Sequence, residues 1–103
     1  DYLAVDESQF FIDLDSFVEK YLKKDKYIHC CGLIADTEKK SFGKLNNLIP
    51  MADEVNSLKA FCVYCRYWKK TAVFTKWVGE GEKKNIIEIG GKGSYIPVCG
   101  KHY

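Results

Sequence analysis

Arginine is almost absent from this chain of 103 residues: Arg66 is the single one, and lysines make up the rest of the 16 basic residues. The 14 acidic residues nearly balance them, so the formal charge is only +2. Proteins that read nucleic acid usually carry a strongly basic face and use arginine for bidentate contacts to bases and phosphates. The composition therefore argues against nucleic acid as a partner.

Long apolar runs and the common phosphate-binding motif are absent as well. No apolar run approaches the roughly 20 residues that a membrane-spanning helix needs, so a membrane is not an expected partner. No G-x-x-x-x-G-K-[ST] sequence occurs, and the chain therefore lacks the loop that cradles nucleotide phosphates. The opening residues, 1–6, do not have the pattern of an export signal.

The cysteine count, five, is odd, which argues against a closed set of disulfides. Two short pairs stand out instead, Cys62-x2-Cys65 and Cys99-x2-His102, with 33 residues between them. Each pair can place two ligands on one tight turn, and together they offer three thiolates and one imidazole. That is a closed tetrahedral set typical of structural zinc, with no open position for catalysis. The sequence predicts a structural Zn²⁺ site, with unrelated buried cysteines as the alternative.

The first half of the chain alternates between strand-like and helical patterns. Tyr2–Val5 is a short apolar run that ends at Asp6-Glu7, typical of a buried strand that delivers two carboxylates at its end. Apolar residues recur at helical spacing over Leu14–Leu22, and Tyr27–Leu33 is a second apolar run. We expect a βαβ unit with parallel strands, in which His29 takes a core position rather than a ligand position. Because a lone core strand needs neighbours, we also expect sequence before residue 1.

The second half of the chain has mainly loop and β-strand patterns. We expect a loop over Ala35–Lys40 and a short helix within Phe42–Ala52 that stops before Pro50. A boundary near Met51–Val55 then separates an α/β part, residues 1–55, from a β-ribbon part, residues 56–103. The expected strands of the ribbon are 57–63, 71–78, 86–89 and 95–98, with a charged loop at 79–85 and a glycine-rich turn at 90–93.

Several motifs occur in a fixed order along the chain. They are Asp6-Glu7-Ser8-Gln9-Phe10-Phe11, Gly32-Leu33, Phe42, Leu48-Ile49-Pro50-Met51-Ala52, Leu58-Lys59-Ala60, Cys62-x2-Cys65, Phe74-Thr75-Lys76, Ile89-Gly90-Gly91, Tyr95 and Cys99. In this combination the chain resembles the cellular-type (type II) thymidine kinase family from Tyr2 to Tyr103. The resemblance implies the C-terminal part of a P-loop-type parallel sheet, followed by a small zinc-ribbon β domain with a lasso loop over the nucleoside. The P-loop would lie in an N-terminal segment missing from this chain.

The resemblance also implies an activity, the transfer of the γ-phosphate of ATP to the 5′-hydroxyl of thymidine or deoxyuridine. Glu7 would be the general base, and Asp6 would hold the Mg²⁺ that accompanies ATP. Carboxylates suit these roles, because phosphoryl transfer depends on positioning and on charge neutralisation. The implied assembly is a cytoplasmic homotetramer with feedback by thymidine triphosphate. The implied nucleoside-binding positions are Gln9, Phe10, Leu33, Phe42, Thr75, Ile86, Glu88, Ile89, Gly90 and Tyr95.

Some positions depart from what the family commonly carries. Ile34 replaces an acid, Thr37 an aromatic residue and Trp77 an arginine. His102 stands where many members have cysteine, but histidine is an equivalent zinc ligand. Two alternatives therefore stay open: a zinc-ribbon binding module, and a kinase half without catalysis that serves assembly or regulation. The near-neutral charge disfavours a ribbon that binds nucleic acid, and Asp6-Glu7 has no role in a bare ribbon.

Overall fold

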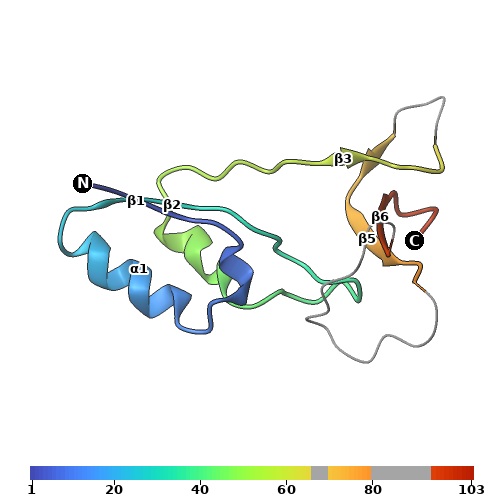
Figure 1. The fold of residues 1–103 in the computed structure, drawn as a ribbon. Helices are drawn as coiled ribbons and strands as arrows, with labels where there is room; N and C mark the ends of the chain where they lie inside the picture. The colour runs from blue at the N-terminus through green and yellow to red at the C-terminus, as the bar shows by residue number, and fades with distance from the viewer. Residues whose placement is uncertain (66–69, 80–93) are drawn as a thin grey trace. The chain divides into compact units, whose positions relative to one another are not determined.

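The structure is a computed structural model that describes residues 1–65, 70–79 and 94–103 (Figure 1). The backbone divides into two compact units, one of residues 1–36 and 40–55 and the other of residues 37–39 and 56–103. Each unit has its own buried cluster of apolar side chains. The chain is thus a small α/β protein. Within the described ranges, no helix is both long enough and apolar enough to cross a membrane.

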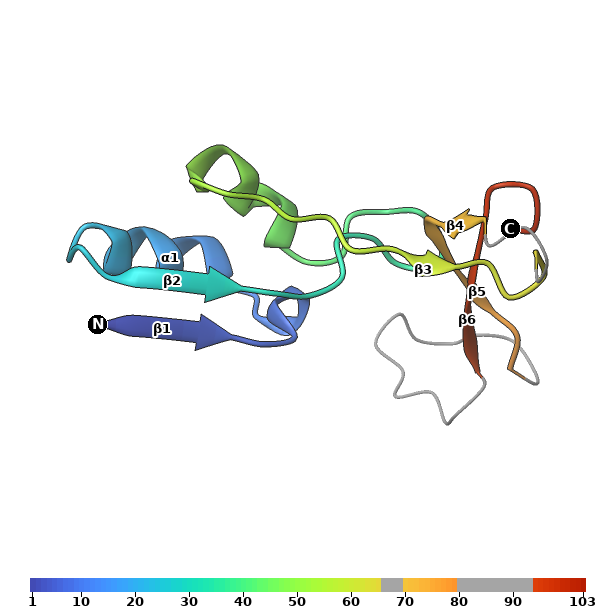
Figure 2. The ribbon, with the colours of Figure 1, turned by 90° about the horizontal axis from the view of Figure 1, so that it is seen from above.

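Unit 1 is built on two parallel strands, β1 (Tyr2–Val5) and β2 (Tyr27–Cys30), joined by helix α1 (Leu14–Leu22). Figure 2 shows the strands side by side and pointing the same way. The predicted βαβ order is confirmed, and so are the bounds of the first strand and of the helix. β2 is three residues shorter than predicted: its ladder with β1 ends at Cys30, and beyond it the backbone N–H of Leu33 bonds to the side chain of Gln9.

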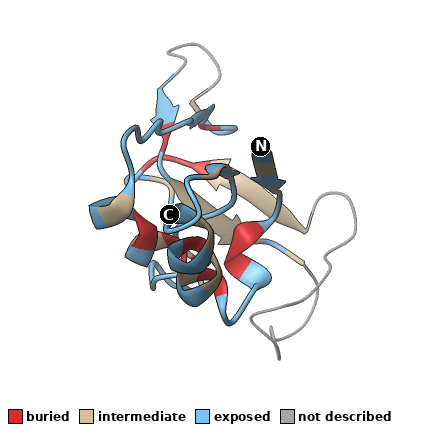
Figure 3. Ribbon diagram, turned by 90° about the vertical axis from the view of Figure 1, so that its left-hand side faces the viewer, coloured by how far each residue is buried: buried red, intermediate tan, exposed pale blue. Residues whose placement is uncertain are grey.

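The core of unit 1 lies on one face of the β1–β2 pair. Leu14 and Val18 of α1 are buried there against two leucines, Leu45 and Leu48. Figure 3 colours the buried residues of the ribbon red. The opposite face is exposed and carries the stacked rings of Tyr2 and Tyr27, 5.1 Å apart. His29 is exposed as well, so its predicted core position is wrong. The reason is strand alternation, which places residue 29 on the same face as residue 27 and away from α1.

Two 3₁₀ helices complete unit 1, η1 (Ser8–Phe10) and η2 (Leu45–Met51). The predicted short helix is present as η2, but the prediction that it stops before Pro50 is wrong, because Pro50 lies inside it. Proline has a fixed φ near −65°, which fits a 3₁₀ turn, and in so short a segment its missing N–H removes a single bond.

The described residues of unit 2 form two short antiparallel pairs, and Figure 2 labels their strands. Strand β3 (Ala60–Phe61) pairs with β4 (Thr71–Ala72), and β5 (Phe74–Trp77) pairs with β6 (Tyr95–Val98). The predicted strand 95–98 is confirmed. The predicted strand 71–78 is interrupted at Val73, since its two ends pair with different partners, and only two residues of 57–63 are paired. The predicted strand 86–89 lies outside the described residues, as do the turn 90–93 and nearly all of the loop 79–85.

Candidate functional site

The carboxyl ends of β1 and β2 meet at one edge of unit 1. The backbone N–H of Cys31 donates to Val5 O at 3.0 Å, and the N–H of Ser8 donates to Cys31 O at 2.9 Å. These bonds continue the parallel pairing one step beyond the strands, and they place Asp6 and Glu7 beside the segment that follows β2. Ligand sites of open parallel sheets form at this edge, outside the carboxyl ends of the strands.

Asp6 is an exposed carboxylate held by two donors. Its Oδ1 accepts a hydrogen bond from the Cys31 thiol at 3.2 Å and from the backbone N–H of Glu7 at 2.9 Å. These two bonds lower the pKa of Asp6, the thiol contributing most, and the same contact raises the pKa of Cys31. Asp6 is therefore an ionised group next to a neutral thiol at neutral pH. A cavity of about 430 Å³, lined mainly by apolar residues of β1 and α1, opens beside it.

Glu7 adopts left-handed backbone angles, φ 50° and ψ 44°, which non-glycine residues rarely take. Its carboxylate is held by Gln9, whose Nε2 donates to Glu7 Oε2 at 2.9 Å. Gln9 is only 3% exposed, and its Oε1 accepts the backbone N–H of Leu33 at 3.1 Å. Both ends of this amide are therefore used, and Gln9 links the Glu7 carboxylate to the chain that follows β2.

Three of the predicted nucleoside-binding positions in unit 1 are aromatic or aliphatic: Phe10, Leu33 and Phe42. The rings of Phe10 and Phe42 meet edge to face, with centroids 5.4 Å apart. Gly43, at φ +62°, allows its own backbone to lie against the backbone of Gln9, because a side chain at residue 43 would overlap Gln9 O. Phe10 and Leu33 remain 44% and 52% exposed. In unit 1, hydrogen bonds therefore connect Glu7, Gln9 and Leu33, and a ring contact connects Phe10 with Phe42.

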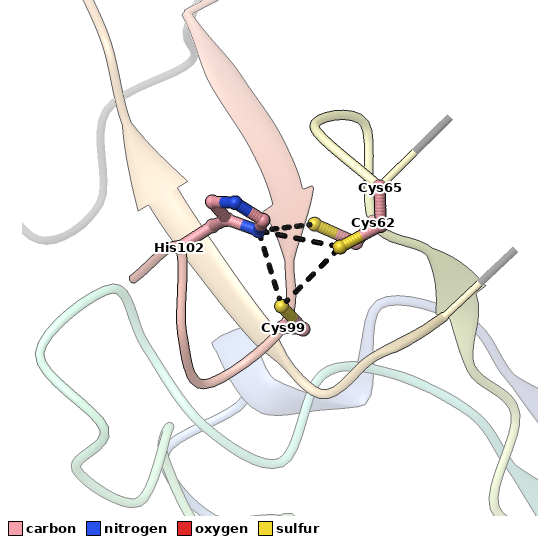
Figure 4. Close-up of side chains that lie close together, drawn as sticks. All are labelled: Cys62, Cys65, Cys99 and His102. Atoms are coloured by element: carbon pink, nitrogen blue, oxygen red, sulfur yellow. Dashed lines mark hydrogen bonds between the residues drawn. The ribbon is translucent and has the colours of Figure 1, made fainter. Parts of the chain in front are cut away.

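The four predicted metal ligands converge at one point in unit 2 (Figure 4). Their ligand atoms all lie within 4.8 Å of one another, and the cluster is partly to fully buried. Each pair sits on a tight turn, in which the N–H of Cys65 bonds to Cys62 O and the N–H of His102 to Cys99 O. These four residues could hold a metal ion.

The spacing of the ligand atoms matches a tetrahedral ion. Zinc bonds of about 2.3 Å to sulfur and about 2.0–2.1 Å to nitrogen give tetrahedron edges of roughly 3.8 Å between sulfurs and roughly 3.5 Å between sulfur and nitrogen. The structure has 3.8 Å between the sulfurs of Cys65 and Cys99. From His102 Nδ1 the sulfur atoms of Cys62, Cys65 and Cys99 lie 3.5, 3.3 and 3.3 Å away.

The thiols of this cluster differ in how readily they ionise. Burial opposes ionisation of the Cys62 thiol, but the backbone N–H groups around it outweigh burial and lower its pKa to about 6. Burial and the neighbouring thiols of Cys99 and Cys62 raise the pKa of Cys65 to about 11. Three thiolates this close repel one another, and a bound cation removes that repulsion.

Comparison with known proteins identifies the family. Residues 1–103 match the sequence profile of the family described as thymidine kinase. The chain is 37% identical over 101 residues to a thymidine kinase of Amsacta moorei entomopoxvirus, covering 96% of this chain and 53% of the relative. It is 38% identical over 104 residues to thymidine kinase a of Arabidopsis thaliana, covering all of this chain and 42% of the relative. The chain belongs to the thymidine kinase family.

The match covers this chain but only part of the length of its relatives. A thymidine kinase of rice is 38% identical over 104 residues, and this chain spans 36% of it. The chain thus covers about half, or less, of the length of these thymidine kinases.

The remaining predicted positions of this thymidine kinase chain belong to unit 2. In the β5–β6 ladder, Thr75 pairs with Pro97 and Trp77 with Tyr95, so all four share one face of the ribbon. The rings of Trp77 and Tyr95 lie 4.8 Å apart. The other face turns Val98 into the buried cluster. Four predicted positions, Ile86, Glu88, Ile89 and Gly90, lie outside the described residues.

Two further residues, outside the predicted site, belong to the carboxylate edge. Cys31 is one of the five cysteines, and its place directly after a parallel strand is the signal that pairs it with Asp6. Gly32 is part of the Gly32-Leu33 motif. In the structure a side chain at Gly32 would overlap Gln9 Oε1 and approach Ser8 N to 3.0 Å. The glycine therefore leaves room for the amide that holds Glu7.

Gly32→Ala is expected to destabilise the protein by about 1–3 kcal/mol, the usual cost of forcing extra volume into a packed site. Either Gln9 moves and loses its bonds to Glu7 and Leu33, or the backbone shifts. Denaturant unfolding measures the change. Gly100→Ala is the matched control, because its new Cβ would meet only Phe74, at an ordinary 3.5 Å. Equal stability of the two variants would show that the contact between Gly32 and Gln9 is not tight.

Proposed function

We propose that the protein containing this chain is an ATP-dependent kinase of thymidine and deoxyuridine that phosphorylates the 5′-hydroxyl. The observation that carries the proposal is the carboxylate pair Asp6 and Glu7 at the parallel-strand edge, held by Cys31 and Gln9, in a chain of the thymidine kinase family. Phosphoryl transfer asks a protein mainly for positioning and for stabilisation of charge, and this edge offers both.

Glu7 is the proposed general base. Gln9 holds Oε2 of its carboxylate, while Oε1 accepts no hydrogen bond from any described residue. A carboxylate oxygen that is fixed in place and free to accept a proton is what removal of the 5′-hydroxyl proton requires. The left-handed backbone at Glu7 turns the chain at the end of β1, and such strain is typical of functional positions.

Asp6 is the proposed contact to the Mg²⁺ that accompanies ATP. Magnesium prefers oxygen ligands and is usually held by one or two carboxylates together with substrate phosphates and water. The exposed Asp6 carboxylate fits, since its Oδ2 accepts no hydrogen bond from the described residues. The ion would neutralise charge on the phosphate oxygens. Binding of the phosphates themselves is assigned to a P-loop segment outside this chain.

Nucleoside binding is assigned to aromatic, aliphatic and backbone groups in each unit. In unit 1 these are Phe10, Leu33 and Phe42, and in unit 2 Thr75 and Tyr95. Backbone groups of Ile86–Gly91 would form hydrogen bonds with the edge of the base, as the resemblance to the thymidine kinase family implies. Residues 1–55 would form the C-terminal part of a P-loop-type sheet, and residues 56–103 a zinc-ribbon domain with a lasso loop.

The metal of unit 2 is proposed to be a structural Zn²⁺ bound by the cluster of Figure 4. Three sulfur donors and one nitrogen donor suit zinc, and four protein ligands leave no position for substrate. Zinc would supply a crosslink that replaces a larger core, because the buried cluster of unit 2 has only four residues in the described part and two of them are ligands. The proposal is completed by a homotetramer, feedback by thymidine triphosphate and a cytoplasmic location.

The activity is tested with radiolabelled ATP and thymidine. The full-length protein should form thymidine monophosphate, whereas residues 1–103 alone should form none, because the phosphate-binding loop is missing. Thymidine lacking its 5′-hydroxyl is the matched negative control. A full-length protein with an intact P-loop but no turnover would support the alternative of a kinase half retained for assembly or regulation. Robust turnover by the 103 residues would contradict the assignment of phosphate binding to another segment.

A further inference from the structure

The position of Cys31 is fixed more tightly than its exposure suggests. Its backbone N–H donates to Val5 O and its carbonyl accepts from Ser8 N, at 3.0 and 2.9 Å. Ser8 is fully buried and its hydroxyl also donates to Val5 O, at 2.8 Å. The backbone of Cys31 is therefore held by hydrogen bonds at both its N–H and its carbonyl, and its thiol lies across the strand pair from Asp6.

The two donors to Asp6 act on the same oxygen. Oδ1 accepts from both the Cys31 thiol and the Glu7 amide, and Oδ2 accepts from neither. The amide alone restrains Asp6 from within its own turn, whereas the thiol restrains it from the neighbouring strand. Two donors from different directions fix the plane of the carboxylate and decide which oxygen remains available.

We propose that Cys31 is a positioning residue for Asp6: its thiol holds Oδ1 so that Oδ2 is presented to the metal ion of the metal–nucleotide substrate. This inference rests on the proposed function of Asp6 and extends it to a residue outside the expected site. A neutral thiol suits the role, because it is a weak donor that adds no positive charge to compete with the cation. The adjacent thiol, Cys30, cannot substitute, since it packs against the core on the α1 side.

The test compares Cys31→Ala, Cys31→Ser and the matched control Cys30→Ala in the full-length protein. Binding of Mn²⁺ with a non-hydrolysable ATP analogue is measured by electron paramagnetic resonance, and the Mg²⁺ concentration for half-maximal thymidine phosphorylation is measured separately. Loss of one hydrogen bond should weaken metal binding about 2–10-fold in Cys31→Ala and raise the Mg²⁺ requirement by the same factor. The KM for thymidine should not change.

Cys31→Ser keeps a donor and should restore metal binding to within about twofold of the wild type, as expected if the role depends on donating a hydrogen bond to Asp6. Cys30→Ala should change thermal stability without changing metal affinity. Equal metal affinity in Cys31→Ala and wild type, or no metal binding by the wild type, would overturn the inference. If the wild type binds Mn²⁺–nucleotide but does not phosphorylate thymidine, the proposed function fails, and the binding data still decide the role of Cys31.

Discussion

Glu7→Gln in the full-length protein is expected to lower kcat by roughly 10²–10⁴-fold, the usual contribution of a positioned general base. The amide keeps the shape of the side chain and can still accept the hydrogen bond that Gln9 Nε2 donates to Glu7 in the structure. It cannot take a proton from the 5′-hydroxyl. The KM for thymidine should change much less, because the substitution removes an interaction needed in the transition state rather than a binding contact.

Steady-state kinetics at saturating Mg²⁺ and ATP would measure this effect. Glu19→Gln is the matched control: the same chemical change at an exposed position of α1, on the surface of the same unit. It should leave both kcat and KM within about twofold, as expected for surface substitutions. A near-normal kcat for Glu7→Gln would remove Glu7 from the role of base and leave it as a residue that shapes the turn after β1.

Cys99→Ser is expected to abolish stoichiometric zinc binding and to unfold unit 2. Cys99 is 1% exposed and belongs both to the metal cluster and to the small buried cluster of the unit. The free energy of metal binding at a site of this kind contributes directly to folding, because the unfolded chain holds no preformed site. In zinc-finger peptides at neutral pH it is about 10–16 kcal/mol. Losing one thiolate from four ligands should remove enough of it to leave the unit unstable.

Elemental analysis of the purified wild type should give one zinc ion per chain and close to none for Cys99→Ser. Amide hydrogen exchange should show lost protection in β5 and β6, with α1 still protected. Cys31→Ser, which removes a cysteine outside the cluster, should keep its zinc. Chelation of the wild type should reproduce the exchange pattern of Cys99→Ser. A unit 2 that stays folded and protected after the metal is removed would contradict a structural role for zinc.

Local patterns were enough to predict several elements and the metal cluster. Helix α1 begins and ends where the apolar spacing indicated, and β1 and β6 have the predicted bounds. The two short ligand pairs likewise predicted the four residues that converge in unit 2. These features depend on residues close together in sequence, or on a spacing that itself specifies the turn. The sequence alone is therefore enough to predict them.

Other features depended on partners distant in sequence. The ladder of β2 with β1 ends at Cys30, beyond which Leu33 bonds to Gln9, and the run 71–78 is divided because its ends pair with different strands. His29 was expected in the core, yet which face of a strand is covered is decided by where α1 packs.

The same distinction holds at the candidate site. The apolar run before Asp6 and Glu7 predicts their place at the end of a strand, and the family resemblance implies their roles. The contacts that join this strand end to the segment after β2, from the Cys31 thiol to Asp6 and from the Leu33 backbone to Gln9, depend on the fold, with Gly32 leaving the space. Parallel pairing aligns the carboxyl ends of strands that are 25 residues apart, as the register of Tyr2 with Tyr27 shows. A contact across that edge follows from pairing and register, which no local pattern encodes.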